Sequence, residues 1–198
     1  MFDAIPGIDF QHTTRDTRLS KSKGLEMPFF PSLPDDAGIG QLFSIKPGHK
    51  EGFSKFSEAV MRDDSVFSIG ERELIAAFTS ALNSCDYCYG GHSAIAQQHG
   101  IEKAIFESVI DDIDLAPVAD KLKPILRFVR KLTVEPHKMV QADADAVFDA
   151  GWDEEALADA IWICARFNMM NRLSLGHGLN ADPAMFEARA KGMNYGKR

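Results

Sequence analysis

The sequence predicts an all-α protein, and three observations lead to this prediction. Apolar residues recur at steps of three and four along most of the chain, which is the spacing of one helical face. Residue types that begin and end helices stand at the borders of these segments. The period-two alternation of a half-buried strand is absent over any useful length. We expect a helical domain over residues 36–198, preceded by an extended N-terminal arm over residues 1–35.

The predicted arm is rich in residues that interrupt helices. Proline fixes the backbone and removes a hydrogen-bond donor, while serine and threonine favour irregular chain. Such an arm can pack across its own domain or wrap around a neighbouring subunit, and the sequence is compatible with both. The residues concerned are Pro6, Thr13, Thr14, Ser20, Ser22, Pro28, Pro31 and Pro34.

The first half of the domain shows clear helix boundaries. A short helix is expected within residues 36–46. A second helix begins near Pro47, a residue suited to a first helical turn, and runs to about Arg62. Ser68 and Glu71 then form a capping box, which opens a third helix.

The fourth predicted helix carries the most informative residues. Asn83 and Ser84 are both N-cap types, so we place the start of this helix just before Cys85. Gly100 is a suitable left-handed cap for its end. Further helices are predicted at residues 101–110, 118–133, 139–150, 153–175 and 182–191, with Gly151 capping the helix at 139–150.

The composition excludes several classes of protein. The net charge is −7 and the pI is near 5.3, which argues against a nucleic-acid partner because phosphate binding needs a basic patch. Residues 1–30 lack the pattern of a secretory leader, and no run of about 18 apolar residues offers a membrane span. The cysteine count is odd, which is untypical of a secreted disulfide scaffold. We therefore expect a cytoplasmic protein with no membrane partner, in which a CxxC is redox-active or metal-binding.

Two cysteines and a histidine share one face of the fourth helix. Cys85, Cys88 and His92 stand three and then four residues apart, a spacing that aligns side chains on a helix. Neighbours at this spacing lie within roughly 5–6 Å, inside the range that a disulfide bridges. A helix N-terminus also stabilises a thiolate, the reactive form of cysteine. The pattern therefore indicates a dithiol that can be reversibly oxidised.

A carboxylate on the preceding helix completes the pattern. Glu73 can reach His92 if the third and fourth helices pack antiparallel across their short connection. A carboxylate partner fixes the imidazole tautomer and favours proton uptake, so that His92 can accept the proton of Cys88. Spacing alone motivates this Glu–His–Cys arrangement.

Other interpretations of the same residues stay open. Cys85, Cys88 and His92 can supply three zinc ligands with a water in the fourth position, although a structural site would need a fourth protein ligand. Cysteine can also be an inert core residue, which is our interpretation of Cys164. We expect His99, on the same stripe, to be a buried and hydrogen-bonded histidine. The spacing favours redox chemistry over zinc binding, and zinc binding over inert packing.

The motif resembles that of a known family. Glu73 followed by Cys85-x-x-Cys88-x-x-x-His92 is similar to the core motif of the AhpD-like alkylhydroperoxidases, in the carboxymuconolactone decarboxylase-like superfamily. The resemblance covers roughly residues 25–180 and implies an all-helical fold and a homo-oligomer, either a trimer or a hexamer. Three further stretches resemble the family or its peroxidase-related branch: residues 68–75, 80–83 and 167–173.

The resemblance implies a two-cysteine peroxidase that needs no cofactor, neither haem nor flavin, and no metal. In that chemistry Cys88 attacks a hydroperoxide and becomes a sulfenic acid, which Cys85 converts to a disulfide. Glu73 and His92 form the proton relay. An external dithiol, such as a lipoyl protein, reduces the disulfide. Alternatives are a zinc-binding or regulatory protein using the same three ligands, and a thiol-disulfide oxidoreductase without peroxidase activity.

Two features bear on these roles. The helix dipole favours Cys85 as the thiol of lower pKa, whereas the family and the spacing to His92 favour Cys88. We choose Cys88 as the thiol of lower pKa, because a specific proton acceptor acts on one thiol while the dipole acts on the whole first turn. Tyr87 stands where the founding alkylhydroperoxidase has a second histidine. Tyr87 is either a hydrogen-bond donor or part of the wall. The decarboxylase branch lacks the CxxC, so both cysteines argue against that activity.

Overall fold

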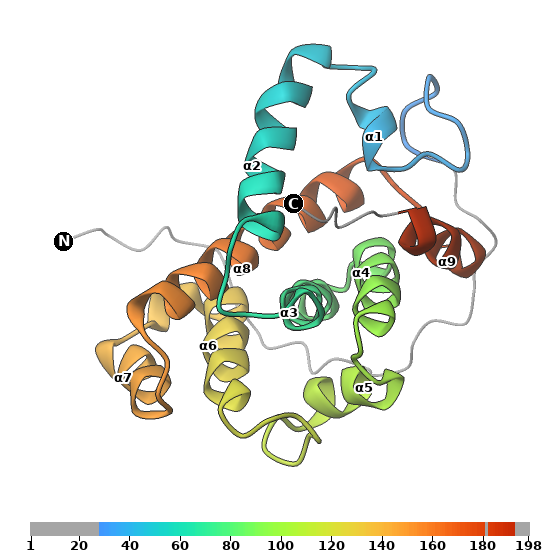
Figure 1. Cartoon of the computed structure of the whole chain (residues 1–198). Coiled ribbons are helices and arrows are strands. Elements are labelled where there is room, and N and C mark those ends of the chain that lie inside the picture. Colours follow the sequence, from blue (N-terminus) through green and yellow to red (C-terminus); the bar gives the residue numbers. More distant parts are fainter. Residues whose placement is uncertain (1–27, 181, 193–198) are drawn as a thin grey trace, which may run out of the picture.

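The computed structural model describes residues 28–180 and 182–192, and over this part of the chain it is helical with no strand (Figure 1). The all-α prediction is therefore confirmed. The predicted arm lies mostly in residues 1–27, outside the described residues, so its role stays a prediction. The helices are α1 (Ile39–Leu42), α2 (Lys50–Arg62), α3 (Ile69–Leu82), α4 (Asp86–Gln98), α5 (Lys103–Asp111), α6 (Leu122–Val134), α7 (Gln141–Asp149), α8 (Glu154–Gly176) and α9 (Pro183–Gly192), with 3₁₀ turns at Pro47–His49 and Pro136–Lys138.

Helix α3 lies at the centre of the fold, surrounded by α4, α5, α6 and α8 (Figure 1). The predicted capping box begins it, because Ser68 Oγ accepts a hydrogen bond from Glu71 N and the Glu71 carboxylate accepts one from Ser68 N. Leu74, Ile75 and Phe78 are fully buried within the main core. Residues 72–81 of this helix are all buried, which agrees with its central position.

The turn between α3 and α4 corrects the predicted start of α4. Asn83 is the C-cap of α3, Ser84 has a left-handed φ of 56°, and Cys85 itself is the N-cap of α4. The cause is tertiary, since the Asn83 amide donates to Thr79 O and to Asn171 Oδ1 and is not available as an N-cap. The correction places Cys85 at the start of α4 and Cys88 in its first turn.

The other predicted boundaries agree closely with the structure. Gly100 and Gly151 follow α4 and α7 with φ values of 90° and 83°, as expected for left-handed caps. The long helix α8 begins at Asp153, whose carboxylate accepts a hydrogen bond from Ala156 N. Its length lets one helix contribute to both the core and the region around the cysteines.

A smaller apolar cluster joins the start of the described chain to its end. It contains Leu33, Ala37, Leu42 and Leu179, and Phe29 N donates to His177 O at 3.1 Å. Figure 1 shows this N-terminal segment and α1 on the same side of the molecule as α9. Together these elements border the N-terminal half of α4.

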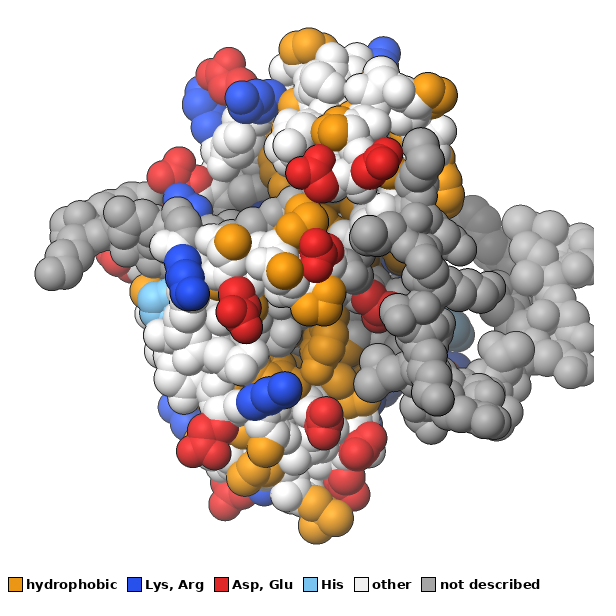
Figure 2. Space-filling view, turned by 90° about the vertical axis from the view of Figure 1, so that its right-hand side faces the viewer, with side chains coloured by type: hydrophobic (Ala, Val, Ile, Leu, Met, Phe, Trp, Pro, Cys, Tyr) orange, Lys and Arg blue, Asp and Glu red, His pale blue; other side chains and the backbone are white. Residues whose placement is uncertain are grey.

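The surface is mixed in charge. Figure 2 shows acidic and basic side chains interspersed over one face of the molecule. Each described helix is too short or too polar to cross a lipid bilayer.

Candidate functional site

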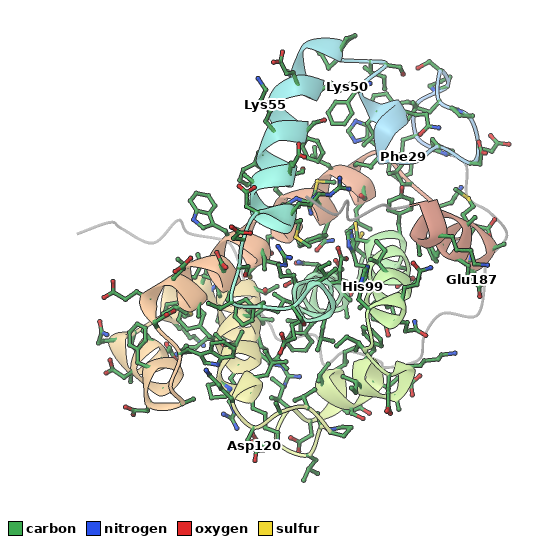
Figure 3. All side chains as sticks on the ribbon, viewed as in Figure 1. Phe29, Lys50, Lys55, His99, Asp120 and Glu187 are labelled. Carbon is green, nitrogen blue, oxygen red and sulfur yellow. The ribbon has the colours of Figure 1, made fainter. Side chains whose placement is uncertain are left out.

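The fold brings together the four residues predicted to form the site. Helix α3 carries Glu73, the start of α4 carries Cys85 and Cys88, and the next turn of α4 carries His92. Side chains fill the space where α3, α4 and α8 meet (Figure 3). The two cysteines are 0% and 4% exposed, and both are free thiols.

Glu73 and His92 form a pair in which the carboxylate is buried and the imidazole is partly exposed. The Glu73 carboxylate is 1% exposed, and its Oε2 lies 2.5 Å from His92 Nδ1. A buried carboxylate needs such a partner, because an uncompensated charge is costly away from water. The ring of Phe167 packs edge-on against the imidazole, with 4.4 Å between ring centroids. Since Nδ1 is occupied by Glu73, Nε2 is the nitrogen left to exchange protons with a ligand.

The two thiols have opposite tendencies to ionise. A hydrogen bond with Cys85 is the main cause that lowers the pKa of Cys88 to about 6, with smaller contributions from Ser174 and His92, although burial opposes it. The Cys88 sulfur lies 3.3 Å from Ser174 Oγ. The same hydrogen bond, together with burial, raises the pKa of Cys85. Near neutral pH, Cys88 is thus the thiolate and Cys85 the protonated thiol.

A polar network behind the thiols was not predicted. Asn171 is fully buried on α8; its amide donates to Ser80 Oγ at 3.0 Å and accepts from Asn83 at 2.9 Å. Asn171 also hydrogen-bonds to both cysteines. At Cys88 this hydrogen bond adds to the lowering of the pKa, and at Cys85 it opposes the stronger effects that raise the pKa. The only sequence signal was the resemblance of residues 167–173 to the peroxidase-related branch, which gave Asn171 no role.

A pocket opens over Cys88 and His92. It encloses about 300 Å³ and has mostly apolar walls. Tyr87 belongs to the wall, and its hydroxyl accepts a hydrogen bond from Ile39 N at 3.0 Å, which ties α1 to α4. The lining residues are Gly38, Ile39, Gly40, Gln41, Phe53, Tyr87, Cys88, Gly91, His92, Ile95, Arg166, Met170 and Phe186.

The remaining site predictions have mixed outcomes. Cys164 is buried in the core, as predicted, with its sulfur 3.2 Å from Thr133 Oγ1. The prediction that His99 is buried is wrong: this residue is the C-cap of α4 and is exposed, because the face that carries the cysteines and His92 is no longer covered in the last turn of α4. Within residues 28–180 and 182–192, no three His, Cys, Asp or Glu side chains are grouped to hold a metal ion. The geometry therefore does not favour the zinc interpretation.

The fold and the site define an all-α protein with a CxxC dithiol beside a Glu–His pair whose carboxylate is buried. The carboxymuconolactone decarboxylase family matches residues 47–117, a stretch that contains all four predicted site residues. A search of curated proteins finds no match.

Solved structures extend the comparison to most of the chain. A protein from Ralstonia eutropha JMP134, described as an alkylhydroperoxidase AhpD core and an uncharacterized peroxidase-related protein, has a TM-score of 0.71 at 25% identity, over 81% of this chain and 95% of that one. An uncharacterized peroxidase-related protein from Silicibacter sp. TM1040 has a TM-score of 0.63 at 23% identity, over 85% of this chain and 97% of that one. A variant of the debrominase Bmp8, in complex with a tribromopyrrole, has a TM-score of 0.63 at 14% identity, over 75% and 79%, which shows the shared fold alone. The family match and the structure from Ralstonia eutropha JMP134 support a relation of this chain to the AhpD-like, carboxymuconolactone decarboxylase-like superfamily.

Proposed function

We propose that this protein is a two-cysteine peroxidase that reduces hydroperoxides through a Cys85–Cys88 dithiol–disulfide cycle. The observation that carries the proposal is the unequal thiol pair: Cys88 has a lowered pKa and lines the pocket, whereas Cys85 contacts it and has a raised pKa. The superfamily and the peroxidase-related neighbours support an enzyme of this general kind.

The first step oxidises Cys88. Its thiolate attacks the terminal oxygen of R–O–O–H, so that an S–O bond forms while the O–O bond breaks. The sulfur becomes a sulfenic acid, and the peroxide is reduced to an alkoxide, which leaves as the alcohol ROH. His92 returns the proton that it took from Cys88, and Glu73 holds the imidazole in position for both transfers.

The second step forms the disulfide. Cys85 attacks the sulfenic sulfur of Cys88, an S–S bond forms, and the hydroxyl leaves as water with the proton of Cys85. The pair is restored by an external dithiol, which supplies two electrons and two protons and becomes a disulfide itself. A lipoyl-type dithiol is our first candidate for this partner. None of these steps needs a metal or a bound cofactor.

Single-cysteine variants test the proposal. Cys88→Ser should abolish hydroperoxide consumption, because the attacking sulfur is gone. Cys85→Ser should still react once and leave a sulfenic acid on Cys88, which dimedone traps for mass spectrometry. Cys164→Ser is the matched control and should keep full activity, since Cys164 lies in the core.

Three results would count against the peroxidase. Wild-type turnover by Cys88→Ser would remove Cys88 from the mechanism. Wild-type protein that exchanges disulfides with a dithiol but ignores hydroperoxides would be a thiol-disulfide oxidoreductase instead. Bound zinc in protein purified with a reductant would favour the metal-binding alternative.

A further inference from the structure

One half-buried cation in the pocket has no role in the mechanism above. Arg166, on α8, lines the pocket together with Cys88 and His92. Its Nε and Nη1 are buried, and they have no hydrogen-bond partner among the described residues. The guanidinium stacks on the ring of Phe167 at 4.6 Å. Buried charged donors are normally satisfied, because leaving one unpaired is costly, so these nitrogens indicate a missing partner.

The charge of Arg166 is retained at neutral pH. Burial lowers the pKa of the guanidinium to about 10, and the negative charges of Glu73 and Cys88 oppose that effect. Neither group replaces a direct partner: within the described part of the chain, Arg166 makes no ion pair with a carboxylate. Among the described residues that line the pocket, Arg166 is therefore the one permanent cation, and none is acidic.

The remaining lining residues indicate what the uncharged part of a ligand would be. Most of the wall area is apolar, and 300 Å³ is at the small end of ligand pockets. A ligand that fits both the apolar wall and the guanidinium is a compact apolar molecule with one anionic group. A carboxylate suits a guanidinium especially well, because it accepts several charge-assisted hydrogen bonds from it. The main apolar wall residues are Ile39, Phe53, Ile95, Met170 and Phe186.

We propose that this pocket binds small apolar carboxylates, with Arg166 as the residue that recognises the anionic group. Under the proposed function, on which this part rests, the substrates are hydroperoxides that carry a carboxylate. The carboxylate binds Arg166 while the peroxide group lies against Cys88. Arg166 is then a residue that determines specificity, and it takes no part in the proton transfers.

A protection experiment tests the anion site without requiring turnover. Reduced full-length protein is alkylated at Cys88 with iodoacetamide in the presence of para-isopropylbenzoate or of its uncharged analogue para-isopropylbenzamide. In the wild type, the carboxylate should protect Cys88 at a concentration at least about tenfold lower than the amide, the difference expected for a charge-assisted hydrogen bond. Arg166→Gln should remove this difference. Arg127→Gln, which alters an exposed arginine paired with Asp114, should preserve it.

The outcomes separate recognition from a mere electrostatic effect on the thiol. If Arg166 only stabilised the Cys88 thiolate, Arg166→Gln would slow alkylation but leave the two protection curves in the same ratio, which would overturn the proposal. Equal protection by both compounds in the wild type would overturn it as well, even if the variant failed to fold.

Turnover links the anion site to the proposed activity. The wild type should consume para-carboxycumene hydroperoxide with a kcat/KM at least about tenfold above that for cumene hydroperoxide, and Arg166→Gln should abolish the preference. Selective protection without any peroxide consumption would confirm the carboxylate site and reject the peroxidase. Consumption of both peroxides without a preference would keep the peroxidase and reject the carboxylate site.

Discussion

Cys88 ionises readily in spite of its burial because several groups stabilise its charge at once. Burial alone raises the pKa of a thiol, as it does for Cys164. At Cys88, the hydrogen bonds with Cys85 and Ser174 and the positive charge of His92 outweigh that effect. The low pKa is thus produced by contacts among particular side chains.

The pH dependence of Cys88 alkylation tests this account at the level of single residues. In the wild type, the rate should rise with pH and reach half of its maximum near pH 6, the lowered pKa. Glu73→Gln removes the carboxylate that stabilises positive charge on the His92 ring. Because that charge favours the thiolate, the midpoint should move to higher pH by roughly one unit.

The direction of this shift is diagnostic. The Glu73→Gln variant should be slower than the wild type near pH 6 and should reach the same rate at alkaline pH. An unchanged midpoint would contradict the role of the Glu73–His92 pair. The exposed Glu51, which pairs with Lys55, provides the control variant Glu51→Gln.

The sequence allowed the prediction of part of the site for a definite reason. Cys85, Cys88 and His92 lie within a few helical turns, so their common face follows from local spacing. Ser174 contacts Cys88 although the two residues are 86 positions apart in the sequence, and no local sequence pattern predicts that contact. Arg166 and Asn171 lie on the same distant helix. Their proximity depends on how α8 packs against α3 and α4, which spacing does not specify.

Among the structural elements, the joint between α3 and α4 positions the two thiols. The N-cap types Asn83 and Ser84 favoured a helix start before Cys85. In the structure, contacts between Asn83 and α8 override this local preference and hold Asn83 at the end of α3. Local sequence patterns thus predicted the helices and most of their ends. The position of the CxxC within its helix depends instead on tertiary contacts.

The contact of α4 with α9 can be tested at Gly90. A Cβ at this position would lie 2.1 Å from the Phe186 ring, so that Gly90→Ala forces this ring of α9 to shift. We expect the free energy of unfolding to fall by about 1–3 kcal/mol, measured by urea denaturation. Gly52→Ala, in an open part of α2, should instead stabilise the protein slightly, because alanine favours the helix.

A second substitution tests whether contact with Phe186 causes this loss of stability. Phe186→Ala combined with Gly90→Ala should be less destabilising than the sum of the two single changes, since the clash is gone. Simple additivity would show that α9 does not pack on Gly90 as described.

At the scale of the whole molecule, the outer face of α8 is unusually apolar. Trp162, Met169 and Leu173 are 57%, 39% and 36% exposed and recur at helical spacing. Exposed apolar patches often mark association surfaces. The family resemblance implies a homo-oligomer, and we expect this face to contribute to its interface.

Association is measured by sedimentation velocity. The wild type should sediment as a trimer or hexamer, and Met169→Glu combined with Leu173→Glu should shift it towards the monomer, because buried unpaired carboxylates are costly. The exposed Val140, which lies outside α8 at the start of α7, provides the control Val140→Glu. A monomeric wild type would contradict the prediction.

The most direct test of the central claim is a thiol map after a single oxidation. Reduced protein, analysed for metal beforehand, is treated with one equivalent of an organic hydroperoxide, and its cysteines are then identified by mass spectrometry. The account predicts a rapid disulfide between Cys85 and Cys88 with Cys164 still reduced. Unreacted Cys85 and Cys88 after complete exposure to the hydroperoxide would contradict it.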